Sequence, residues 1–376
     1  MIKAFIVNLV VLFLFSTSDA YAIFGTVGLD PSFCQLKSVR QTIVYIDDML
    51  MIEGKTDWAN KLASKLKASL APGERTSVVR LSPSDGHSKE IWTGCWPDYS
   101  AEQRAVIAKE TYLVSKNPLD GLEEQQGFFV RDFGAAVSKI YAESKRQESE
   151  ARFAPEKAPQ KQILRALASD EGRFSNSPMT VRAIIYSDMA ENSDLGSVFK
   201  PLPTPQINYA EKLGTHLRKS VFYSFGVGED VIGGQAMQEK AKIFWSHALK
   251  VMSAIVGGFD ADLNVSNRIP VRSFLYDLTL QFANQGIDGK TSVLTDDEGN
   301  IVDSWLGFNR LSITGLTGTF RCKEERCKLD GSTTSNLLME NSPSENLLLT
   351  GKRNQLSGEL GLKGQTIFPL TAIESQ

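Results

Sequence analysis

Acidic residues follow two apolar segments of the chain at the points where those segments end. The first segment, Thr42–Ile46, leads into two aspartates, and the second, Val181–Tyr186, leads into a serine and an aspartate. Apolar, β-branched runs of this length are typical of central strands in a sheet covered by helices. Ligands of such sheets bind beyond the carboxyl ends of the strands. We therefore expect four polar residues to share one edge of a sheet: Asp47, Asp48, Ser187 and Asp188.

Oxygen-bearing side chains at such an edge suit more than one kind of chemistry. A hard cation such as Mg²⁺ or Mn²⁺ prefers carboxylate, hydroxyl and water ligands, and Asp47 with Asp188 could hold one weakly. A bound cation could in turn activate water for hydrolysis. The same side chains could instead contact a partner protein, or cap turns and helix N-termini at the top of the sheet.

The segments around these residues alternate between strand and helix patterns. Residues 57–70 and 235–255 carry apolar side chains at helical spacing. Residues 75–94 indicate a pair of strands, and residues 220–228 a further central strand that ends in a glycine turn. This alternation predicts an α/β domain over residues 23–258, with a mostly parallel sheet and helices on both faces.

The pattern changes after residue 258. Short alternating segments separated by turns follow, among them residues 274–280, 300–306 and 365–370. Several short strands at such spacing are typical of an antiparallel sandwich or barrel. We therefore expect a smaller, β-rich C-terminal domain over residues 259–376.

The N-terminus has the pattern of a secretory signal peptide. A basic start at Lys3 is followed by an apolar run over residues 4–15 and by Ala20-Tyr21-Ala22, which fits a cleavage site. The apolar run is shorter than the roughly 20 residues that a spanning helix needs. We expect cleavage after residue 22 and a periplasmic or secreted protein with no transmembrane anchor.

The cysteines predict disulfides, and the net charge argues against one class of binding partner. Four cysteines in an exported chain indicate disulfides, and we favour Cys34–Cys95 and Cys322–Cys327. The formal net charge of −3 is too small and too mixed for a protein that binds nucleic acid electrostatically.

The order of elements over residues 40–258 resembles a von Willebrand factor A domain. The stretches Ile43–Asp47, Ala183–Met189 and Val221–Gly228 carry the resemblance. Members of that family with a metal-ion-dependent adhesion site have Asp-x-Ser-x-Ser after the first strand. Here the motif is Asp47-Asp48-Met49-Leu50-Met51, and the loop 155–159 has no threonine. The resemblance thus implies a degenerate site at which only Asp47 and Asp188 of the pattern remain. These two could hold Mg²⁺ or Mn²⁺ only weakly, and we expect no cofactor.

The resemblance and the signal peptide together favour a binding protein over an enzyme. We expect a non-catalytic module of a bacterial envelope assembly that binds a protein partner at the carboxyl edge of the sheet. One alternative is a cation-dependent envelope hydrolase that uses Asp47, Asp48 and Asp188. The other is a scaffold whose C-terminal β domain carries out the recognition.

Overall fold

The computed structural model describes most of the chain downstream of the expected signal peptide. Residues 1–22 lie outside the described part. The described residues are 28–50, 57–110, 117–151, 160–175, 179–200, 217, 220–227, 235–282, 285–309, 313–335, 344–361 and 367–375, without the side chains of residues 110 and 145–151.

The N-terminal half is built around a six-stranded sheet in the order β3-β2-β1-β4-β7-β8. All neighbours pair in parallel except β2 and β3, which form an antiparallel hairpin. The mostly parallel α/β sheet that the sequence predicted is therefore confirmed. Its strands are β1 (Arg40–Asp47), β2 (Arg75–Ser82), β3 (His87–Cys95), β4 (Thr180–Tyr186), β7 (Ser220–Phe225) and β8 (Ile255–Phe259).

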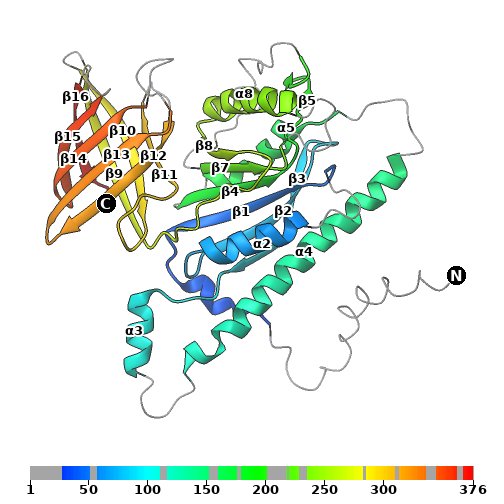
Figure 1. Cartoon of the computed structure of the whole chain (residues 1–376), viewed down its shortest axis with the longest axis horizontal. Coiled ribbons are helices and arrows are strands. Elements are labelled where there is room, and N and C mark those ends of the chain that lie inside the picture. Colours follow the sequence, from blue (N-terminus) through cyan, green and yellow to red (C-terminus); the bar gives the residue numbers. More distant parts are fainter. Residues whose placement is uncertain are drawn as a thin grey trace.

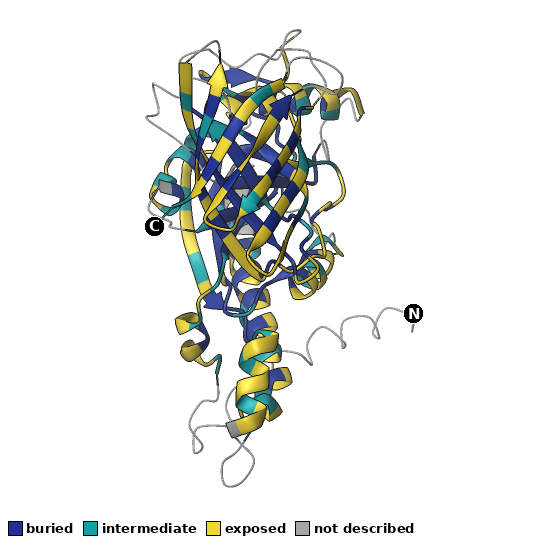
Figure 2. Ribbon diagram, turned by 90° about the vertical axis from the view of Figure 1, so that its left-hand side faces the viewer, coloured by how far each residue is buried: buried dark blue, intermediate teal, exposed yellow. Residues whose placement is uncertain are grey.

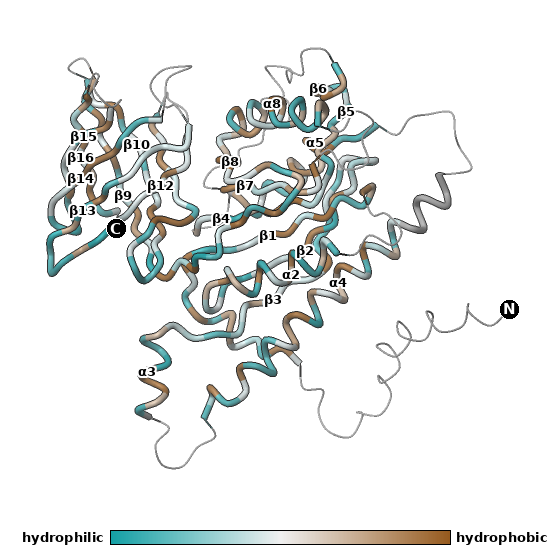
Figure 3. The backbone as a smooth tube through the Cα atoms, viewed as in Figure 1, coloured by the Kyte–Doolittle hydropathy of each residue, from teal (hydrophilic) through white to brown (hydrophobic). Residues whose placement is uncertain are grey.

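Helices cover both faces of this sheet (Figure 1). Alternate residues of a strand point to opposite faces, so Ile43 and Tyr45 of β1 pack with α5, α6 and α8, whereas Val44 and Ile46 pack with α2 and α4. Hydrophobic segments accordingly lie along the central strands and on stretches of α4 and α8 (Figure 3). The helices are η1 (Pro31–Gln35), α2 (Asp57–Ser69), α3 (Ala101–Glu110), η2 (Pro118–Gly121), α4 (Leu122–Ala151), α5 (Ile163–Ala168), α6 (Glu171–Ser175) and α8 (Gln235–Val251).

The C-terminal half is a closed antiparallel barrel, which is one of the two architectures that the sequence predicted. Each strand pairs with the next along the chain, and β9 closes the barrel by pairing with β16. Buried and exposed residues alternate along these strands (Figure 2), and mainly leucine and aromatic side chains fill the interior. The strands are β9 (Arg272–Phe282), β10 (Gln285–Thr295), β11 (Ser304–Phe308), β12 (Ile313–Lys323), β13 (Arg326–Thr333), β14 (Asn346–Lys352), β15 (Gln355–Gly361) and β16 (Ile367–Glu374).

Both disulfides join the cysteines that the sequence analysis paired. Cys34–Cys95 links η1 to the edge strand β3, and Cys322–Cys327 cross-links the hairpin of β12 and β13. Disulfides persist in oxidising compartments, so these two fit a periplasmic or extracellular protein. Among the described helices, none is both long enough and apolar enough to cross a bilayer.

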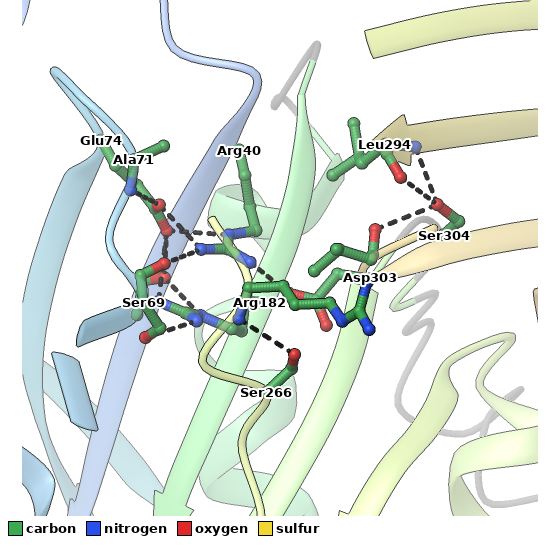
Figure 4. Close-up of polar contacts among 12 residues, drawn as sticks. Arg40, Ser69, Ala71, Glu74, Arg182, Ser266, Leu294, Asp303 and Ser304 are labelled. Carbon is green, nitrogen blue, oxygen red and sulfur yellow. Dashed lines mark hydrogen bonds and ion pairs between the residues drawn. The ribbon is translucent and has the colours of Figure 1, made fainter. Parts of the chain in front are cut away.

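A buried cluster of charges joins the barrel to the amino ends of the sheet strands (Figure 4). Arg40 of β1 donates two hydrogen bonds to the Glu74 carboxylate, each 2.9 Å long, and forms an ion pair with Asp303 of the barrel. Arg182 of β4 lies 3.5 Å from the same Glu74 carboxylate. Tyr223 of β7 donates a hydrogen bond of 2.5 Å to the other oxygen of Asp303. Two carboxylates thus balance two guanidinium groups at the junction of the domains.

The electrostatics of this cluster favour its charged form. Burial alone would raise the pKa of Glu74, but the charges of Arg40 and Arg182 outweigh it and lower that pKa. Burial and the nearby Arg40 charge lower the pKa of Arg182 to about 10, which still leaves a cation at neutral pH. Because Asp303 comes from the barrel, the two domains complete one ionic cluster and form a single packed unit.

Candidate functional site

The acidic residues that end β1 and β4 lie side by side. These two strands pair in parallel, with Ile46 opposite Tyr186, so Asp47 and Ser187 occupy the same level at the carboxyl edge. The Ser187 hydroxyl donates a hydrogen bond of 2.6 Å to Oδ2 of Asp47. The edge that the sequence analysis proposed is therefore a real meeting point of segments 140 residues apart.

A lysine that the sequence analysis did not single out lies between the two aspartates. Nζ of Lys161 is 2.8 Å from Oδ2 of Asp47 and 2.5 Å from Oδ1 of Asp188. Its side chain is only 9% exposed. The backbone of Lys161 exchanges hydrogen bonds of 3.2 and 2.8 Å with that of Asn192, just after β4, which fixes the lysine over the strand ends.

The ammonium group is held in its charged form. Burial by itself would lower the pKa of Lys161, but the carboxylates of Asp47 and Asp188 outweigh this effect and raise the pKa. A second cation between the same oxygens would be repelled by this charge. The donor set with Lys161 in place therefore does not fit a Mg²⁺ or Mn²⁺ site, and the described residues contain no group of three or more His, Cys, Asp or Glu placed to hold a metal.

The structure separates Asp48 from the other three predicted residues. Its Oδ2 accepts hydrogen bonds from Nε of Arg80 at 2.7 Å and from the Ser82 hydroxyl at 2.6 Å, so the side chain is directed toward β2. Burial raises the pKa of Asp48 in spite of these partners. The Ser144 hydroxyl of α4 donates to the Asp48 carbonyl. Asp48 is thus part of the contact between β1, β2 and α4.

The other three residues also shape the backbone at the edge. Oδ1 of Asp47 accepts a hydrogen bond of 2.9 Å from the Met49 amide, and Oδ1 of Asp188 accepts one of 2.9 Å from the Ala190 amide. The Ser187 hydroxyl oxygen accepts one of 3.0 Å from the Met189 amide. Each side chain therefore caps the turn that follows its strand, as Asx and Ser turns do.

Two large apolar side chains in the loops of this edge are exposed. Met49 follows β1 and is 36% exposed. Phe199 follows the short strand pair β5 (Asn192–Ser193) and β6 (Gly196–Ser197) and is 49% exposed. Exposed aromatic and methionine side chains are enriched at protein interfaces. The edge thus combines a fixed charge cluster with apolar contact groups.

A buried glutamate lies close to this cluster and was not predicted. Glu191 is completely buried. Its carboxylate accepts hydrogen bonds from the Leu164 amide at 3.0 Å and from the Ser193 hydroxyl at 2.5 Å. Burial raises the pKa of Glu191 to about 7, although these hydrogen bonds oppose the shift. The only sequence signal is its place in the run Asp188-Met189-Ala190-Glu191, directly after β4.

Glu191 is expected to make stability depend on pH in the neutral range. Because its pKa rises from 4.5 to about 7 on folding, its contribution is fully present below the lower value and is lost as the pH rises through the higher one. Between roughly pH 4.5 and pH 8 the wild type should lose roughly 3 kcal/mol of unfolding free energy relative to Glu191→Gln, which cannot titrate. Urea denaturation at a series of pH values measures this difference. The exposed Glu123→Gln should follow the wild-type profile, and a Glu191→Gln profile parallel to the wild type would refute the assignment.

The strand order of the sheet decides the fold of the first domain. The arrangement β3-β2-β1-β4-β7-β8 is that of a doubly wound sheet, with the first strand in the middle and an antiparallel edge strand. Asp47 is the last residue of the central strand β1, and Asp188 lies just beyond the end of its central neighbour β4. The first domain therefore has a doubly wound α/β fold, the fold class to which the resemblance noted in the sequence also belongs.

Comparisons with known proteins do not assign this chain to a family. No family model matches the chain, and no curated protein matches it. Among solved structures, the chain is similar to the crystal structure of VWA2, the ArnB paralog from Sulfolobus acidocaldarius, with 13% identity and a TM-score of 0.33. The match covers 84% of this chain, which spans 65% of the length of that one. A likeness at this level carries no argument about the fold or the function of this chain.

Proposed function

We propose that this chain is an exported, non-catalytic protein-interaction module of a bacterial envelope assembly, and that its partner binds at the carboxyl edge of the sheet. The observation that carries the proposal is the Lys161 ammonium between Asp47 and Asp188. In metal-dependent adhesion sites a cation from solvent neutralises the acids at this position. Here the chain supplies the cation itself, so binding at this edge needs no metal.

The charge and exposure of the edge define the partner's chemistry. Two carboxylates face one ammonium group, which leaves about one negative charge on the cluster, and Asp188 is its most exposed member at 12% of the side chain. A lysine or arginine of the partner would pair with that carboxylate. The apolar side chains of Met49 and Phe199 lie in the loops of the same edge and would supply the dehydrated contact that carries most of the affinity.

Capture of the partner from the organism's own envelope fraction tests this proposal. We expect the double variant Met49→Ala with Phe199→Ala to weaken capture by roughly 5- to 30-fold, because truncating interface anchors costs about 1–2 kcal/mol. Capture by the wild type should persist in a chelator of divalent cations.

The matched control is Val106→Ala on α3, an apolar side chain that is 51% exposed away from the edge. It should capture the partner as well as the wild type does. Equal loss in the control, or loss of wild-type capture in the chelator, would refute metal-independent binding at this edge.

A further inference from the structure

The outer surface of the barrel carries a basic cavity around its disulfide-linked hairpin. The cavity has a volume of about 750 Å³ and is formed by β12, β13 and β14. Its lining includes no acidic residue, and Thr350, Gly351 and the disulfide cysteines complete it. Five basic side chains surround it: Arg321, Lys323, Arg326, Lys328 and Lys352.

The strand register places these charges directly against one another. Arg321 lies opposite Lys328 across the β12–β13 pair. In the next row, Arg326 lies opposite Lys323 on one side and opposite Lys352 on the other. Like charges directly opposite on a sheet destabilise it. A row of three cations across three strands therefore works against folding and is typical of a site selected for another reason.

Few of these charges are neutralised within the protein. Lys328 pairs with Asp330 at 2.7 Å, and Nε of Arg321 donates to the Glu298 carbonyl at 3.1 Å. In the part of the chain that the structure describes, Lys323, Arg326 and Lys352 form no ion pair. The hairpin tip carries two glutamates, at positions 324 and 325, which do not line the cavity.

We propose that this cavity binds a ligand that presents two or more phosphate groups. Guanidinium and ammonium groups are the usual recognition groups for phosphate oxygens, and charge-assisted hydrogen bonds to them are strong. The volume falls within the range of about 300–1,000 Å³ that is usual for small-ligand sites. The Cys322–Cys327 bridge cross-links the two strands that carry four of the five cations, which limits the ordering needed on binding.

A discrete polyphosphate fits this site better than an anionic membrane surface does. The two glutamates of the tip lie beside the cavity and would be repelled by a negatively charged bilayer. This inference concerns a different face from the proposed partner edge and does not depend on it.

Calorimetric titration of the mature full-length chain with tripolyphosphate tests the proposal. The variant Lys323→Gln, Arg326→Gln, Lys352→Gln should bind at least tenfold more weakly than the wild type. Added salt should weaken binding by the wild type more steeply than it weakens binding by the variant.

The matched control changes three exposed cations of the first domain, Lys67→Gln, Lys89→Gln and Lys109→Gln, and should bind as the wild type does. Unchanged thermal unfolding would show that both variants fold.

Three outcomes would overturn the proposal. The first is no tripolyphosphate binding by the wild type. The second is equal weakening in the cavity variant and in the control, which would show general charge attraction. The third is cavity-dependent co-sedimentation with phosphatidylglycerol vesicles without tripolyphosphate binding, which would assign the patch to a membrane surface.

Discussion

Replacing Glu74 with glutamine is expected to lower the free energy of unfolding by about 3–5 kcal/mol. The Glu74 carboxylate is fully buried and pairs with the fully buried guanidinium groups of Arg40 and Arg182. Glutamine keeps the shape but removes the charge, and the cluster would then hold two cations and only the Asp303 carboxylate. Removing one partner of a buried ion pair is costly because the remaining charge stays desolvated. Chemical denaturation followed by tryptophan fluorescence measures the loss.

The matched control for this experiment is Glu90→Gln. Glu90 pairs with Arg173, but both side chains are about one third exposed, at 33% and 30%. Exposed ion pairs contribute about 0–1 kcal/mol, so this variant should stay within that range. A loss for Glu74→Gln no larger than that of Glu90→Gln would show that the cluster at the domain junction does not stabilise the fold.

Replacing Lys161 with alanine is expected to destabilise the protein by about 3–5 kcal/mol and to create a site for a divalent cation. Without the ammonium group, the carboxylates of Asp47 and Asp188 face the vacated space with no neutralising charge. Carboxylate, hydroxyl and water oxygens are suitable ligands for Mg²⁺ and Mn²⁺. Thermal unfolding should therefore shift upward when either ion is added to Lys161→Ala, whereas the wild type should show no shift.

Lys200→Ala is the control for this result, since Lys200 is an exposed lysine of the same edge. Its stability should stay close to that of the wild type, and Mg²⁺ or Mn²⁺ should not change it. An equal response of the wild type and Lys161→Ala to the ions would mean that the lysine does not occupy the cation position.

The sequence alone predicted those parts of the fold that follow from local patterns. The apolar runs that end in Asp47 and Asp188 identified the central strands, and because parallel neighbours share an edge, the meeting of these acids followed from topology. The closed barrel was only one of two predicted architectures. Its closure depends on the pairing of β9 with β16, and such distant pairing leaves no local signal in the strands.

The charge partners could not be predicted in the same way. Lys161 lies two residues beyond the loop 155–159, in which the family pattern would place a threonine. A lysine in a polar segment is ordinarily a solvent-exposed residue. Arg40 and Asp303 are 263 residues apart, in different domains. Asp48 was expected to share the edge with Asp47 and Asp188, but its side chain is directed toward Arg80 and Ser82 of β2. The direction of that side chain depends on packing in three dimensions, which the local sequence does not reveal.

The contacts of Arg40 and Tyr223 with Asp303, here called the clamp, affect how far apart two binding partners of this protein would be held. The clamp lies at the start of β1, whereas Asp47 lies at its end, about 23 Å away along an extended strand. The barrel is therefore attached to the amino ends of the strands, and the cluster of Asp47 and Asp188 lies at their carboxyl ends (Figure 1). Two binding partners attached at these ends would therefore be separated by roughly the length of β1, and the packed junction would restrict their relative orientation more than a flexible linker does.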